Sequence, residues 1–381
     1  MKTGMYRIVA WVLVAIAGMF YGMAACKFQL FPYPDVRSWY EDHLKPIPAE
    51  YLATPEHYTR TDVAGLISIQ RPADIEEKRQ ALITVLWGEP GLPGALPSIV
   101  DRDFHDGRYD NIPELARIDR LTVSMEFGLE SRAYHFVPET PNERLVIYHQ
   151  GHRGDFHESK PQIRRFLEEG YTVVALTMPL LGLNNQPTVE LPGLGHLTLT
   201  EHDNMRFLSP EHGIPVQYFI EPVVVLLNHL AREFEPSNVA MTGISGGGWT
   251  TTLAAAVDTR IRNSFPLAGS YPLYLRSRSA RDWGDYEQNL PALYRTVNYP
   301  EMYVLGSYGE GRQQLQIINQ FDRCCFAGTK WETYKDVVRD RVEALGAGRF
   351  DLFMDSSHRD HRFSDAAMRR ILDELQHSGA E

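Results

Sequence analysis

The sequence has few cysteines and no excess of positive charge, and each lack excludes a class of protein. Cysteine accounts for only three of 381 residues, which is too few for the disulfide framework of a small secreted scaffold. The formal net charge is −11, so the chain carries no general nucleic-acid-binding surface, and we expect no nucleic-acid partner. No internal repeat or low-complexity tract is present. With 43% hydrophobic and 23% charged residues, the composition is that of a globular protein.

The three cysteines stand in two places. Cys26 follows the apolar N-terminal segment, whereas Cys324 and Cys325 are adjacent. We expect Cys324 and Cys325 to be two small buried thiols, with a strained disulfide between these neighbours as the alternative.

The N-terminus holds one long apolar run. Lys2 and Arg7 precede a charge-free stretch from Ile8 to Ala25. This pattern predicts that residues 1–26 are a signal anchor or a signal peptide. The run exceeds the usual apolar core of a signal peptide, about 7–15 residues, and three aromatic residues suit a membrane helix: Trp11, Phe20 and Tyr21.

The leading positive charges orient such a segment. They predict that the N-terminus stays in the cytoplasm and that the rest of the chain lies in the periplasm or outside the cell. Secretion after cleavage is the alternative. A third is lipidation at Cys26, because Met23-Ala-Ala-Cys26 resembles a bacterial lipobox, with Met a poor match at its first position.

The rest of the chain divides into an irregular and a regular part. Residues 27–116 are rich in proline and turn residues, with one expected helix at 72–86, and we expect them to pack on the core as an N-terminal extension. From 117 to 381 the sequence predicts one large domain, in which 270–311 is an aromatic, charged insertion that could form a cap.

Short apolar runs alternate with amphipathic stretches through this domain. The runs predict an antiparallel pair first and then strands separated by helices, at 120–127, 132–137, 145–148, 171–177, 238–242, 262–267, 315–319 and 350–354. The helices are expected at 161–169, 214–234, 330–345 and 364–375, with Ser364 as an N-cap. Strand–helix alternation predicts an α/β fold with a mainly parallel central sheet covered by helices on both faces.

One glycine cluster stands at the end of the fifth of these strands. Gly243, Ser245 and Gly247 fit the pattern G-x-S-x-G, in which serine occupies a sharp turn from strand to helix. Glycines on either side let the two backbones pass without a Cβ collision. The serine hydroxyl is then exposed above the sheet, and the backbone N–H of Gly246 stands at a helix N-terminus, where it can hold an oxyanion.

Together, this motif and the order of the strands resemble the α/β-hydrolase fold superfamily of serine esterases and lipases, over about two thirds of the chain. The resemblance implies a triad in the chain order serine, acid, histidine. It implies Ser245 as nucleophile and Asp322, just after strand 315–319, as the acid, with Glu310 as the rival. Two histidines, His358 and His361, follow the last strand. We favour His361, which stands three residues before the capped helix, and keep His358 as the alternative.

A second oxyanion donor is expected in the loop after strand 145–148. His149-Gln-Gly-His152 resembles the His-Gly-x loop of esterases, although Gln150 interrupts the usual pattern. The donor is then the N–H of Gly151 or His152, and Gly151 lets the backbone approach the substrate. His149 serves equally well as a structural group beneath the turn.

These residues predict a serine hydrolase that cleaves a carboxylic ester through an acyl-enzyme on Ser245. No cofactor and no metal are expected, since the His358/His361 pair lacks a third ligand. The partner is a small-molecule, lipid or carbohydrate ester, and the membrane is reached through the N-terminal segment. The alternatives are an acyltransferase or peptidase with the same triad, and a non-catalytic binding protein on this fold.

Overall fold

The computed structural model describes residues 2–28, 30–89, 91–276 and 283–377, and it divides the chain into two units, 1–49 and 50–381. The smaller unit consists of helices α1 (Lys2–Phe28) and α2 (Tyr33–His43). From Tyr6 to Phe28, α1 is long and apolar enough to cross a membrane or to act as a signal sequence, and almost none of it is buried. The expected extension 27–116 is thus divided between the two units.

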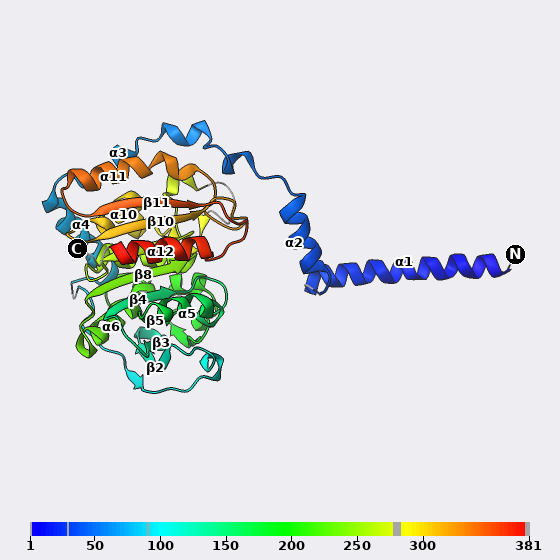
Figure 1. Ribbon diagram of the computed structural model, residues 1–381, viewed down its shortest axis with the longest axis horizontal. Helices are drawn as coiled ribbons and strands as arrows, with labels where there is room; N and C mark the ends of the chain where they lie inside the picture. The colour runs from blue at the N-terminus through cyan, green and yellow to red at the C-terminus, as the bar shows by residue number, and fades with distance from the viewer. Residues whose placement is uncertain (1, 29, 90, 277–282, 378–381) are drawn as a thin grey trace. The chain divides into compact units, whose positions relative to one another are not determined.

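The larger unit is built on one nine-stranded sheet, with the strand order β1-β2-β3-β5-β4-β8-β9-β10-β11 (Figure 1). The strands are β1 (Ile99–Asp101), β2 (Leu115–Ser124), β3 (Glu130–Pro138), β4 (Arg144–His149), β5 (Thr172–Leu176), β8 (Asn238–Ile244), β9 (Asn263–Leu267), β10 (Gln313–Asn319) and β11 (Arg349–Asp355). Strands β1, β2 and β3 pair antiparallel, and the order from β5 to β11 is wholly parallel. The predicted α/β class and mainly parallel sheet are confirmed.

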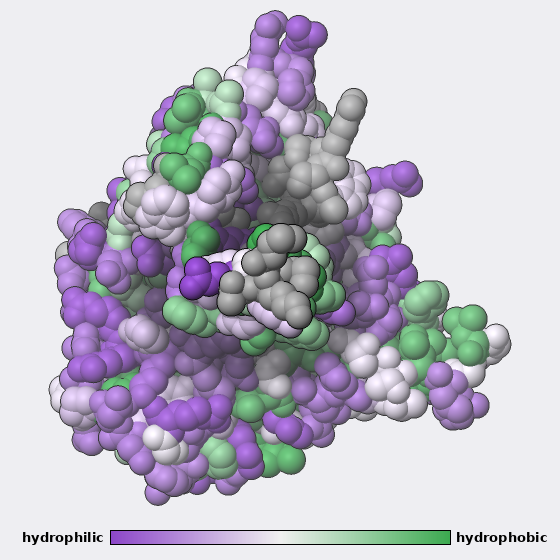
Figure 2. Space-filling view, turned by 90° about the vertical axis from the view of Figure 1, so that its right-hand side faces the viewer, coloured by the Kyte–Doolittle hydropathy of each residue, from purple (hydrophilic) through white to green (hydrophobic). Residues whose placement is uncertain are grey.

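Helices cover both faces of the sheet and enclose two apolar cores. One core holds α4 (Pro72–Trp87), α6 (Gln217–Glu233), α7 (Gly246–Val257), α10 (Tyr299–Ser307) and α11 (Lys335–Ala344). The other core holds α5 (Lys160–Glu168) and α12 (Asp365–His377). Hydrophilic residues cover most of the face shown in Figure 2, and its apolar residues occur in separate small groups.

Helix α4 belongs to this core although it precedes the sheet in sequence. Its buried Arg79 donates hydrogen bonds to the carbonyls of Ala256 in α7 and Leu305 in α10. These carbonyls stand in the last turns of their helices, where no further turn supplies an N–H. The arginine therefore satisfies the ends of two helices at once.

The structure also contains elements that the sequence pattern did not reveal. Between β5 and α6 the chain forms a hairpin of β6 (Thr188–Leu191) and β7 (Gly195–Thr198) and the short helix η6 (His202–Phe207). The insertion 270–311 contains η7 (Leu273–Leu275), η8 (Tyr286–Gln288), α9 (Pro291–Tyr294) and α10. Residues 277–282 of the insertion lie outside the described residues.

One helix prediction differs from the structure in detail, and one predicted cap is confirmed. The expected helix at 330–345 is divided into η9 (Lys330–Thr333) and α11, whose N-cap residue Tyr334 has non-helical dihedral angles. The expected cap is confirmed, because the Ser364 hydroxyl accepts the N–H of Ala367 at 3.0 Å.

Candidate active site

Ser245 lies in a sharp turn between β8 and α7. Its φ of 59° and ψ of −124° place a non-glycine residue in a sparsely populated region, which costs about 1–3 kcal/mol. The turn is held by the Ser245 N–H, which donates to the Leu267 carbonyl of β9 at 2.9 Å. Helix α7 then begins at Gly246, and the first N–H groups of a helix have no partner within it.

The flanking glycines allow the backbone of the turn to touch the backbone of β4. A Cβ on Gly247 would lie 2.0 Å from the His149 carbonyl oxygen, and one on Gly243 would lie 2.6 Å from the same atom. Real Cβ atoms do not approach backbone so closely, so neither position tolerates a side chain without moving strand β4. The glycines fix the height at which Ser245 stands above the sheet.

The predicted acid and one predicted histidine are hydrogen bonded to each other. Nδ1 of His361 lies 2.6 Å from Oδ2 of Asp322, which is fully buried. A carboxylate only accepts, so Nδ1 carries the proton and donates it, and Nε2 keeps its lone pair. No group among the described residues hydrogen bonds to this buried Nε2.

Neighbouring groups hold both side chains in place. Oδ1 of Asp322 accepts the N–H of Cys324 at 2.7 Å. The loop of His361 is tied to the end of β10 by Asn319, whose side-chain amide donates to the Arg362 carbonyl at 3.0 Å. Since β10 and β11 are adjacent parallel strands, the loops that follow them meet at one edge of the sheet.

The second predicted histidine, His358, lies elsewhere. Its side chain is almost fully buried, and Nε2 lies 3.3 Å from Oδ2 of Asp355 at the end of β11. Burial alone would raise the pKa of Asp355, but His358, Ser357 and Ser364 lower it well below its usual range. The rival acid Glu310 is exposed in the turn before β10, away from His361.

The predicted oxyanion loop lies directly against the serine turn. A Cβ on Gly151 would be 2.5 Å from the Ile244 carbonyl oxygen and 3.3 Å from the Gly246 nitrogen. Glycine at 151 therefore brings its own backbone beside the amide of Gly246. The ring of His152 packs on the other side, since a Cβ on Gly246 would meet its Cε1 at 2.5 Å.

His149 is a buried structural group. Nδ1 donates to the Gln150 carbonyl at 2.8 Å, and burial lowers the pKa of its ring to about 4. The neutral ring lies beneath the loop that carries Gly151.

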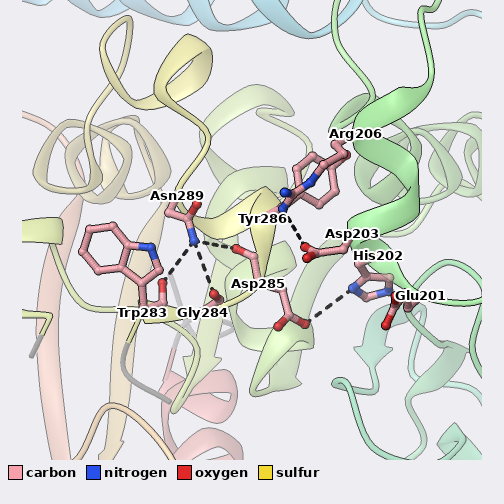
Figure 3. Close-up of a pocket in the computed structure, with 9 residues that line it drawn as sticks. All are labelled: Glu201, His202, Asp203, Arg206, Trp283, Gly284, Asp285, Tyr286 and Asn289. Atoms are coloured by element: carbon pink, nitrogen blue, oxygen red, sulfur yellow. Dashed lines mark hydrogen bonds and ion pairs between the residues drawn. The ribbon is translucent and has the colours of Figure 1, made fainter. Parts of the chain in front are cut away.

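Three residues that the sequence reasoning missed meet His152 beside the cavity. Nε2 of His152 lies 2.9 Å from Oε1 of Glu287 and 3.0 Å from Oδ2 of Asp285. His202 is close to the same two carboxylates, and Figure 3 shows the Asp285 side chain pointing toward it. Burial would raise the pKa of Glu287, but the two histidines lower it to about 2. Their spacing along the chain gave no signal, because long insertions separate the three segments.

A cavity of about 440 Å³ joins these parts. Ser245 and His361 both line it, together with residues from β8, the loop after β4, the segment around η8 and the loop after β10. These other residues are Gln150, Gly151, His152, Arg153, Glu158, Ile244, Gly284, Asp285, Gln288, Cys324, Cys325 and Phe326. The expectation of two buried thiols is wrong, since Cys324 and Cys325 are half-buried and joined by a disulfide. The loop after β10 brings the two sulfur atoms together at the cavity wall.

No protein-family model and no curated protein matches the sequence. Among solved structures, the chain is similar to acetyl xylan esterase 1 from Thermoanaerobacterium sp. JW/SL YS485, with 13% identity, 85% of this chain and 99% of that one covered, and a TM-score of 0.55. An acetyl xylan esterase from Paenibacillus sp. R4 gives 13% identity, the same coverage and a TM-score of 0.54. Methylesterase BT1017 is 14% identical, with 88% of this chain and 65% of that one covered and a TM-score of 0.51. Likeness at such low identity concerns the fold, and this chain has the α/β-hydrolase fold.

The buried His149 makes the stability of the protein depend on pH. Its pKa is about 4 when folded and about 6.5 when unfolded, so below pH 6.5 the unfolded chain binds a proton that the folded protein refuses. We expect the free energy of unfolding to fall by about 2 kcal/mol more between pH 7 and pH 4.5 in the wild type than in His149→Gln. Urea unfolding at both pH values measures this difference, and equal pH dependence in the two proteins would contradict it.

Proposed function

We propose that the protein is a serine hydrolase that cleaves a carboxylic ester through an acyl-enzyme on Ser245. The observation that carries the proposal is the paired Asp322 and His361, whose free Nε2 and the Ser245 turn border one cavity. The fold and its esterase neighbours of known structure support an ester substrate.

In this proposal each group has its own step. His361 Nε2 takes the proton of the Ser245 hydroxyl as its oxygen attacks the acyl carbon. The amide of Gly246 and that of Gly151 or His152 stabilise the oxyanion that forms. His361 then gives the proton to the leaving alcohol, and water attacks the acyl-enzyme with the same histidine as base. Asp322 holds the tautomer and stabilises the imidazolium.

Substitutions of the proposed catalytic residues should lower kcat to different extents. Ser245→Ala and His361→Ala should each lower kcat by about 10⁶, and Asp322→Asn by about 10⁴, because the asparagine amide favours the wrong tautomer. His358→Gln is the matched control and should stay within about tenfold of the wild type once its fold is verified by circular dichroism. Steady-state ester hydrolysis measures all four. An inactive His358→Gln beside an active His361→Ala would reverse the assignment of the base.

The lining of the cavity supports a short acyl group on a polar alcohol. Polar or charged side chains line one part of it, including Gln150, Arg153, Glu158, Asp285 and Gln288. A long acyl chain would desolvate these groups without a partner for them. Two of the structural neighbours are acetyl xylan esterases, which is consistent with a small acyl group on a carbohydrate.

A short acyl group predicts a substrate preference, which a series of esters with acyl chains of increasing length measures. The value of kcat/KM for 4-nitrophenyl acetate should exceed that for the decanoate by at least about tenfold, since the longer chain pays a desolvation cost of more than about 1.4 kcal/mol. A value that rises steadily with chain length would instead indicate a lipase-like substrate.

We also propose that α1 is retained as a membrane anchor and that residues 50–381 face the periplasm or the cell exterior. The support is the length and apolar character of Tyr6–Phe28 and the position of Lys2 and Arg7 before most of it. An ester of an extracellular carbohydrate would then meet the enzyme at the cell surface.

Fractionation of cells tests the anchor. The full chain should stay in the membrane pellet after an alkaline carbonate wash. A variant in which a cleavable signal peptide replaces residues 1–29 should be released into the soluble fraction. A mature chain whose N-terminal sequence starts at or near Cys26 would show that the residues before that position are removed, by a signal peptidase or during lipidation.

A further inference from the structure

Four side chains from three distant segments converge beside the catalytic cavity. His152 comes from the loop after β4, His202 from η6, and Asp285 and Glu287 from the segment around η8. One nitrogen or oxygen atom from each lies within 4.8 Å of all the others. The proposed ester hydrolysis uses none of these four side chains as acid, base or nucleophile.

The distances match a tetrahedral set of metal ligands. Nε2 of His152 lies 2.9 Å from Oε1 of Glu287 and 3.0 Å from Oδ2 of Asp285. Nδ1 of His202 lies 3.6 Å and 3.8 Å from the same two oxygens. Bonds of about 2.0–2.1 Å from zinc to nitrogen and oxygen give tetrahedral ligand–ligand distances of about 3.3–3.4 Å, the middle of this range.

The tautomer of His202 directs a lone pair at the carboxylates. Nε2 lies 2.9 Å from the Pro179 carbonyl, which only accepts, so Nε2 carries a proton. In the neutral ring Nδ1 is then an acceptor that faces two carboxylate oxygens. A backbone carbonyl that holds the far nitrogen is the usual support of a histidine ligand.

A second observation points to a missing cation. Glu287 is completely buried, and its Oε2 has no hydrogen-bond partner among the described residues. Two carboxylates and two imidazoles leave this cluster short of positive charge unless both rings take up protons. Asp285, by contrast, is half exposed and lines a neighbouring cavity of about 400 Å³ with His202, which gives an ion a path from solvent (Figure 3).

We infer that His152, His202, Asp285 and Glu287 form a binding site for one divalent transition-metal ion, with zinc the best fit to two nitrogen and two oxygen ligands. With four protein ligands the site is closed, which is typical of a structural metal rather than a catalytic one. His152 adjoins Gly151 and packs on Gly246. The ion therefore positions the oxyanion loop against η6 and η8 without touching the substrate.

Metal titration tests the site directly and needs no substrate. Untagged full-length protein is freed of metal with a chelator and titrated with Zn²⁺ by calorimetry. The wild type should bind one equivalent. Asp285→Asn and Glu287→Gln should each weaken binding by more than about 100-fold, beyond the roughly 10–100-fold that losing an outer hydrogen-bond partner costs. Co²⁺ should give the intense visible bands of a tetrahedral ion in the wild type but not in Asp285→Asn or Glu287→Gln.

Two controls separate this site from others. Asp203→Asn changes an exposed carboxylate of the same neighbouring cavity and should leave zinc binding unchanged. His361→Ala removes the histidine that lies near Cys324 and Cys325, the other cluster of candidate ligands in the described chain, and should also bind zinc normally.

Two results would overturn the inference. One is a wild type that binds no zinc, which would mean that two protonated histidines balance the carboxylates. The other is zinc binding that Asp285→Asn and Glu287→Gln leave intact. Asp285 is half exposed, so its variant should fold even if the change at Glu287 does not. Ester hydrolysis is measured separately, so loss of the zinc site and loss of the proposed activity are distinguishable.

Discussion

The site depends on a contact between two stretches of backbone that no side chain can enter. The turn at Ser245 touches the end of β4 so closely that a Cβ on Gly247 would lie 2.0 Å from the His149 carbonyl oxygen. The same contact sets Gly151 beside the amide of Gly246. Strain at Ser245 is maintained because strands β4, β8 and β9 fix both ends of the turn. The proposed nucleophile and the proposed oxyanion donors thus belong to one rigid arrangement.

Much of this arrangement could be predicted from the sequence because its signals are local. Apolar runs of β-strand length marked the strands, and G-x-S-x-G marked the turn after the fifth of them. The resemblance to the hydrolase fold indicated Asp322 and His361 near strand ends, and parallel neighbours bring such ends together. The choice between His358 and His361 needed the structure, since only side-chain direction separates a ring paired with Asp322 from one buried against Asp355.

What the sequence did not reveal depends on contacts between distant insertions. The hairpin β6–β7 and η6 lie in a stretch where the sequence pattern predicts no strand or helix. His202 in that stretch meets Asp285 and Glu287 of another insertion, and no spacing rule connects them. The four-residue cluster links these insertions to the loop of Gly151. Through this cluster, the two insertions hold the loop of Gly151 in position on a fold that the chain shares with the esterases of known structure.

The central claim is that Ser245 is a nucleophile activated by His361, and covalent labelling tests it most directly. A fluorophosphonate probe should react with the wild type and label the peptide that contains Ser245, as identified by mass spectrometry. Ser245→Ala should show no labelling, and His361→Ala should be labelled far more slowly. Well-folded wild-type protein that fails to react, or that reacts at another residue, would contradict the account.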